Sequence, residues 1–321
     1  MSQKIYIIAS CTDRKRVEAD EERLLRSLPV EGDLEASADL WWSRVTGATS
    51  TVAASDLYAG SHWKTVLEMS SIAPDCEVET WVASAGLGLI ASTDRVPSYG
   101  ATFARSQPDS VSRLEAPSSE DRDVDKRWWG QLSRHRLDER ENPRSVTTLA
   151  LQCPNAVLLV AAGPNYVAAM SEDLCSARTQ LCHPEQLLIV TSPSQFEASS
   201  LASNVIPSTA DLQPVVGGAL TSLHARVGAK ILRERGSYDL NASSLQARYS
   251  HLALRSPKSS APSRDALDDD EVRGFIRDAL VANPRVARTT LLRELRASGR
   301  ACEQKRFKGL FEQVIEGPHY A

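Results

Sequence analysis

Residues 4–16 read KIYIIASCTDRKR, and this stretch decides the expected fold. Its first half, Ile5–Ala9, is a short apolar run that ends in small residues, which is typical of a buried strand. One acid and three bases, Asp13–Arg16, follow immediately. Because ligands of open α/β sheets bind beyond the carboxyl ends of the strands, we expect Asp13 to lie at the mouth of a cleft.

Three further apolar runs predict strands at 78–84 (VETWVAS), 156–162 (AVLLVAA) and 187–192 (LLIVTS). The last two are almost continuously apolar, as in strands that are covered on both faces. Helical spacing of apolar residues predicts helices between and after them, at 62–72, 165–178 and 218–235. The alternation indicates an α/β fold with a mostly parallel sheet flanked by helices.

Composition shifts divide the chain into an α/β domain at 1–254, a linker at 255–270 and a small all-α domain at 271–321. The linker RSPKSSAPSRDALDDD is rich in Ser, Pro and charge. Within the first domain, the polar segment 105–145 is expected to be an insertion that carries one helix.

The last domain shows three short helical patterns with Gly299 before a basic third helix, which is the outline of a helix-turn-helix. Residues 272–311 contain ten Lys and Arg against three Asp and Glu, although the whole chain has a net charge of −4. This concentration favours contact with nucleic acid, and the alternative is a solvated basic helical cap. The expected DNA-binding side chains here are Arg288, Gln304, Lys305, Arg306 and Lys308.

The bulk composition indicates a globular protein, with 42% hydrophobic and 24% charged residues in 321. No apolar run approaches the roughly 18–20 residues that cross a bilayer. The six cysteines form no CxxC pair and have no zinc-ligand spacing, so we expect reduced thiols, no metal, no cofactor and a cytoplasmic protein.

The loop after the first strand is the first candidate site. Asp13 is the candidate catalytic carboxylate, and Arg14, Lys15 and Arg16 would hold phosphates. The preceding Ser10, Cys11 and Thr12 would line the binding site. The alternative is that Asp13 caps a helix that starts at Arg14, with the bases merely solvated.

Small and aromatic residues mark further loops. Ala85 and Gly86 in SAGLGLI permit close approach of a ligand. Tyr99 in VPSYGATF stacks on a base or, alternatively, packs in the core of a tight turn together with Phe103. The stretch SDLYAGSHW adds the candidates Asp56 and Tyr58, as well as His62, which alone is a weak candidate for a catalyst.

The two later strands end in polar residues. Asn165, at the start of a helix, would bond a base edge or cap that helix. Ser192 follows the fourth strand in TSPSQF. Both are candidates for the catalytic site.

Four stretches, IIASCTDRKR, DLYAGSHW, SAGLGLI and PSYGATF, resemble an uncharacterised bacterial family found near phage-defence genes. The order of strands and loops over about 1–235 also resembles the uracil-DNA glycosylase superfamily. The resemblance implies that Asp13 positions a water molecule. The late His-Pro-Ser loop of that superfamily is Ser192-Pro193-Ser194 here, so its histidine has no counterpart.

The resemblance implies a metal-independent DNA glycosylase in antiviral defence. It would flip a modified base out of double-stranded DNA and hydrolyse its N-glycosidic bond, leaving an abasic site. Glucosylated hydroxymethylcytosine of phage DNA is the implied substrate, and a monomer is favoured. Ala85–Gly88, all small except Leu87, would leave room for such a base.

Two alternatives remain open from the sequence. One is a helix-turn-helix transcription regulator whose α/β domain senses a nucleotide. The other is a metal-dependent nuclease that uses Asp13, Asp56 and the acids of SEDRDVD (119–125), although such an acidic run is typical of a solvated helix start.

Overall fold

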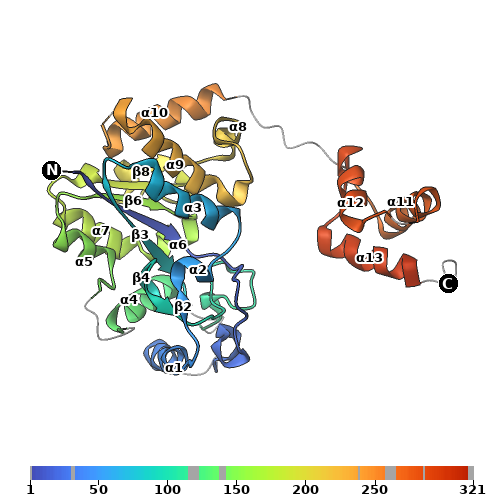
Figure 1. The fold of residues 1–321 in the computed structure, drawn as a ribbon, viewed down its shortest axis with the longest axis horizontal. Helices are drawn as coiled ribbons and strands as arrows, with labels where there is room; N and C mark the ends of the chain where they lie inside the picture. The colour runs from blue at the N-terminus through green and yellow to red at the C-terminus, as the bar shows by residue number, and fades with distance from the viewer. Residues whose placement is uncertain are drawn as a thin grey trace. The chain divides into compact units, whose positions relative to one another are not determined.

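A six-stranded sheet forms the centre of the larger of two units, Met1–Pro257 (Figure 1). The computed structural model describes residues 2–29, 33–114, 123–136, 142–237, 239–256, 265–284 and 286–316. The strand order is β4-β3-β1-β6-β7-β8. In that order the strands are Gly88–Ala91, Glu77–Ser84, Lys4–Ser10, Val157–Ala161, Leu187–Thr191 and Val205–Pro207.

Four of the five strand pairs are parallel, and only β3 and β4 are antiparallel. The predicted α/β class with a mostly parallel sheet is therefore confirmed. The four strands expected from the sequence are present within one residue of their predicted ends. The edge strands β4 and β8 were not predicted, since each is short.

The two faces of the sheet are covered by different helices. Successive side chains of β1 point to opposite faces of the sheet, as in any strand. Ile5 and Ile7 pack against a first group of helices, and Tyr6 and Ile8 pack against a second group. The first group is α3 (Ser61–Ile72), α9 (Leu223–Glu234) and α10 (Ala242–Arg255). The second is α1 (Leu34–Thr46), α4 (Val124–Arg134), α5 (Val146–Gln152), α6 (Pro164–Ala169) and α7 (Ser171–Gln180).

The helix predicted over 165–178 is two helices. The chain leaves helical geometry at Met170, with ψ of 1°, and α7 then packs against α5. The helix predicted over 218–235 begins only at Leu223. The short elements of this unit are β2 (Val52–Ala53), α2 (Ala54–Leu57), β5 (Arg95–Val96) and α8 (Gln213–Val216).

The predicted insertion at 105–145 does carry a helix, α4, within the described residues 105–114, 123–136 and 142–145. This helix belongs to the core, because Trp128 and Trp129 are buried on it. Most of the acidic run 119–125 lies outside the described residues. Of its described members, Asp123 pairs with Lys126 at 2.8 Å and Asp125 is buried.

The described part of the second unit, Lys258–Ala321, contains three helices around a core of its own. They are α11 (Asp269–Ala282), α12 (Arg288–Ala297) and α13 (Gln304–Glu316). Two short strands, β9 (Asp265–Ala266) and β10 (Arg300–Ala301), pair in parallel. Residues 265–270 of the predicted linker are thus part of the folded unit.

None of the described helices is long and apolar enough to cross a membrane.

Candidate functional site

The loop after β1 is an extended segment tied to the stretch between α2 and α3. Two backbone bonds join them, from the Arg16 amide to the Leu57 carbonyl at 2.9 Å and from the Ala59 amide to the Arg14 carbonyl at 3.0 Å. The Thr12 hydroxyl also donates to the Ala59 carbonyl, at 3.1 Å. No helix starts at Arg14, so the interpretation of Asp13 as a helix cap is wrong.

Asp13 lies on the wall of a hollow of about 400 Å³ at the carboxyl end of β1. This volume is within the range of small-molecule sites, about 300–1,000 Å³. Four segments build the wall: the loop after β1, the 3₁₀ turns that hold Leu24 and Arg26, the loop that holds Tyr99, and the start of the 105–145 segment. Its polar side chains are Asp13, Lys15, Glu18, Arg26, Ser98, Tyr99, Thr102, Gln107 and Asp109.

The two aspartates of this hollow, Asp13 and Asp109, differ in their partners. Asp109 is held by Arg26, whose guanidinium lies 3.0 Å away and whose backbone amide donates at 3.1 Å. Asp13 is exposed and has no hydrogen-bonded or ion-paired partner among the described residues. Asp13 is therefore available to a ligand, as is Glu18 on the same wall, which is also exposed. Of the two, Asp13 lies nearer in the chain to the carboxyl end of β1.

Lys15 projects over the faces of two tyrosines. Its Nζ lies 4.5 Å from the centre of the Tyr99 ring and 5.9 Å from that of Tyr58. Burial lowers the pKa of Lys15, while Cys11, Asp13 and Asp109 oppose that shift. The Lys15 amine is thus easier to deprotonate than an exposed lysine.

The phenols beneath Lys15 form a buried chain. The Tyr58 and Tyr99 hydroxyls are 2.8 Å apart, and the Tyr99 hydroxyl lies 2.5 Å from Ser84 Oγ. Burial raises the pKa of both tyrosines, so they stay protonated. Tyr99 is only 1% exposed and Phe103 is fully buried. The aromatic core of a tight turn, not a stacking platform, is therefore the arrangement found.

The loop Ala85–Gly88 gives no room for a ligand. The carbonyl oxygens of Ala85 and Gly86 accept bonds from the indoles of Trp128 and Trp41, both at 2.7 Å. A Cβ at Gly86 would lie 2.5 Å from the Tyr99 ring. The expectation of a roomy pocket beside this loop is wrong, because aromatic side chains fill the space.

A second hollow, of about 920 Å³, lies beside the first and is basic, with four Lys and Arg side chains and one acid, Glu68, which lies 4.0 Å from Lys64. Arg14 and Arg16 line it together with Lys64 and the N-terminus of α3, where Gly60 turns the backbone with φ of 98°. Among the described residues, neither arginine has an ion-pair partner. Lys15 lines both hollows.

The structure separates the remaining candidates from Asp13. Asn165 is the second residue of α6, whose N-cap is Gly163, and it lines a third hollow of about 340 Å³ with Arg105 and Gln195. Ser192 precedes a short 3₁₀ turn and lines none of these hollows. Asp56 is exposed on α2. The hollow that holds Asp13 is thus not the one that holds Asn165.

The residues directly after β1 are buried beneath the loop and hold it in place. Ser10 and Cys11 are 8% and 7% exposed. The Cys11 thiol lies 3.2 Å from the Tyr166 hydroxyl, and His62 Nε2 lies 3.1 Å from the Ser10 carbonyl oxygen. Burial lowers the pKa of His62. These contacts hold the loop in place and leave little of either residue for a ligand.

Sequence reasoning missed several wall residues of the first hollow. Ser98 and Thr102 flank Tyr99 in VPSYGATF, so the loop that drew attention to the tyrosine also held them. Gln107 and Asp109 come from the polar 105–145 segment. No local pattern marks them, because their place depends on the bridge between Thr102 and Ser110.

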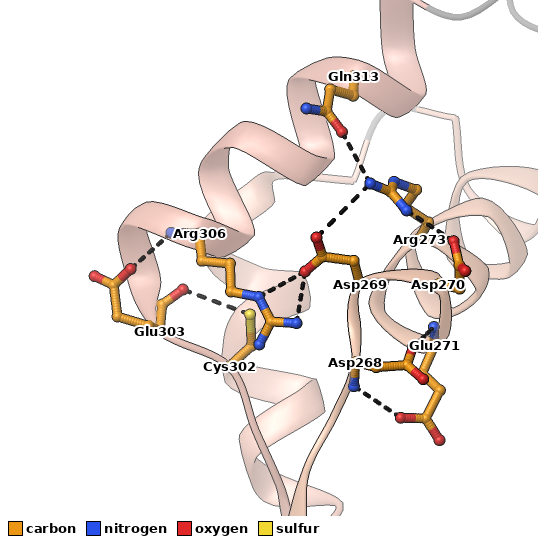
Figure 2. A network of polar contacts seen from close by, with 9 residues as sticks. All are labelled: Asp268, Asp269, Asp270, Glu271, Arg273, Cys302, Glu303, Arg306 and Gln313. Atoms are coloured by element: carbon orange, nitrogen blue, oxygen red, sulfur yellow. Dashed lines mark hydrogen bonds and ion pairs between the residues drawn. The ribbon is translucent and has the colours of Figure 1, made fainter.

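In the second unit, most of the predicted DNA-binding cations are paired with acids. Figure 2 shows the Arg306 guanidinium bonded to Asp269, with Nε 2.7 Å from Oδ1. Arg288 and Lys308 both lie 3.7 Å from Glu312. Gln304 and Lys305 are exposed, and Lys305 has no ion-pair partner in the described part of the chain.

The first turn of α11 supplies much of this acidic charge. Asp268 caps α11 and forms a capping box with Glu271, as the acids at this helix start predict. Lys258–Ala321 contains twelve Lys and Arg and ten Asp and Glu, so its net charge is only +2. The basic excess expected from 272–311 is largely compensated by flanking acids.

Within the described residues, no group of three or more His, Cys, Asp or Glu side chains is arranged to hold a metal ion. No family model, curated protein or solved structure matches this chain.

Proposed function

We propose that this protein is a DNA glycosylase whose chemistry takes place in the hollow that holds Asp13. One observation carries the proposal: a hollow with an unpaired carboxylate adjoins a basic hollow, and Lys15 lines both. A nucleotide fits this pair of hollows, because its anionic phosphates need the basic hollow, and its uncharged sugar and base can lie beside the carboxylate in the other. The first hollow takes the flipped nucleoside, and Arg14 and Arg16 bind the phosphates beside it.

Cleavage of an N-glycosidic bond places positive charge on the sugar and negative charge on the departing base. Asp13 stabilises the sugar cation and orients the attacking water. The exposed amide of Gln107 offers a donor and an acceptor to the base. Ser98 and Thr102 are buried and bonded within the wall, Ser98 to the Val17 carbonyl and Thr102 to the Ala104 amide. Gln107 therefore takes the base-contacting role that the sequence suggested for Asn165 and Ser192.

The three-helix unit supplies additional affinity for DNA in this proposal, as a helix-turn-helix formed by α12 and α13. Lys305 and Gln304, at the exposed start of α13, are the side chains that remain available for contact. The ion pairs elsewhere in the unit make this contribution smaller than that of the basic hollow.

The test is incubation of the protein with glucosylated phage DNA and with unmodified DNA. Alkali-labile sites and free base are then scored. The proposal expects abasic sites in the modified DNA, at a rate well above that in the unmodified DNA. Folded protein that binds both DNAs and produces abasic sites in neither would refute it.

A further inference from the structure

Lys15 occupies an unusual position for a phosphate-binding residue. Its side chain is partly buried, and its Nζ lies over the Tyr99 ring with one weak bond, 3.4 Å to the Thr12 carbonyl oxygen. No carboxylate lies within ion-pair distance of it among the described residues. By contrast, Arg14 and Arg16 on either side are exposed.

We propose that the Lys15 amine is a nucleophile that forms a Schiff base with the aldehyde of an abasic site and thereby cleaves the DNA strand. This activity rests on the proposed function, since its substrate is the abasic site that a glycosylase leaves. It goes beyond that function because base hydrolysis alone leaves the strand intact.

Three features of the site support this chemistry. Nucleophilic lysines are amines that are desolvated in apolar surroundings, and two tyrosine rings provide such surroundings here. Burial lowers the pKa of Lys15, which raises the fraction of free amine at a given pH. Asp13 lines the same hollow and is available as a base.

The reaction balances without a cofactor. The neutral Nζ of Lys15 adds to C1′ of the ring-opened deoxyribose. The hydroxyl of the resulting carbinolamine takes a proton from solvent and leaves as water, which gives a protonated imine. Asp13 then takes a proton from C2′, the electron pair forms the C2′–C3′ double bond, and the 3′-phosphate departs with the electrons of the C3′–O bond. Water hydrolyses the imine and restores the amine.

The experiment uses the full chain and an oligonucleotide with a preformed abasic site, so that it does not depend on base release by this protein. Sodium borohydride reduces the imine to a stable protein–DNA adduct, and peptide mapping by mass spectrometry identifies the attached residue. We expect the adduct on Lys15, and a yield that rises with pH to half its maximum below the ordinary lysine value of 10.5.

Two variants test the assignment. Lys15→Arg keeps the positive charge but forms no stable imine, so the adduct should fall about 100-fold while binding of abasic DNA persists. The matched control is Lys230→Arg on α9, whose lysine pairs with Glu234 at 2.5 Å, and its adduct yield should be unchanged. An adduct on another residue, or none with wild-type protein that binds the abasic DNA, would overturn the inference.

The outcomes separate this inference from the proposed function. Base release from modified DNA without any adduct on abasic DNA refutes only the Lys15 chemistry. An adduct on Lys15 without base release from any DNA supports the amine chemistry and refutes the glycosylase.

Discussion

The loop after β1 and the helix α13 both carry runs of basic residues, but their surroundings differ. Arg14 and Arg16 have no ion-pair partner among the described residues and line an open hollow. Arg306 and Lys308 face acids on α11 and on α13 itself. A run of bases in a sequence therefore does not define a binding surface, because the fold decides how many of them acids neutralise.

The sheet unit also differs from the three-helix unit in its buried titratable groups. Burial lowers the pKa of His224 to about 4, with a smaller effect from the neighbouring His62, and its Nδ1 has no hydrogen-bond partner. The only histidine of the second unit, His319, lies outside the described residues. Acid should therefore affect the sheet unit first.

The largest effect that we expect is this loss of stability of the sheet unit in acid. The unfolded state binds a proton at His224 below about pH 6.5 and the folded state only near pH 4, so stability falls as the pH drops between them. The loss amounts to about 3 kcal/mol. Urea unfolding at pH 7 and pH 4, followed by the fluorescence of the tryptophans, measures it.

The variants make the acid experiment specific. His224→Leu should make the pH dependence clearly shallower, because it removes the histidine with the largest shift, while His62 and His135, whose pKa values burial also lowers, still contribute. His251→Leu, a change at an exposed position of α10, should leave the dependence as in the wild type. An equally steep loss in His224→Leu would show that other groups control the acid stability.

A smaller effect, on DNA binding, tests the basic hollow directly. The double variant Arg14→Ala/Arg16→Ala should weaken binding roughly tenfold and reduce the salt slope of log K by about 2, since each phosphate contact contributes about 0.9. The control is Arg255→Ala at the exposed end of α10. If both variants lost the same amount of DNA affinity, the basic hollow would have no special role in DNA binding.

The smallest effect concerns the ion pairs of the second unit. Asp269→Asn should release Arg306 and raise DNA affinity by a few fold, with only a slight change in melting temperature, since the pair is exposed. Asp278→Asn removes the same charge from an exposed position of α11 and should give a smaller gain. Fluorescence anisotropy with a short duplex compares them, and equal gains would mean that the pairing does not limit binding.

The strands were predictable because their apolar runs are mostly buried on both faces, as for Leu187–Thr191, although the first half of β3 is only half-buried. The four side chains of α13 that were expected to contact DNA are exposed, namely Gln304, Lys305, Arg306 and Lys308. The site was less predictable, because its walls depend on long-range contacts. Nothing near Asp109 in the sequence indicates that Arg26 will hold it, or that Asp13 will remain free.

The most direct test of the account is the effect of Asp13→Asn on base release from glucosylated DNA, with Asp56→Asn as the control outside the hollow. The account predicts that Asp13→Asn lowers the rate at least about 100-fold while DNA binding persists, because it removes the carboxylate that stabilises the sugar cation. Asp56→Asn should retain the wild-type rate. Wild-type base release by Asp13→Asn would contradict the account.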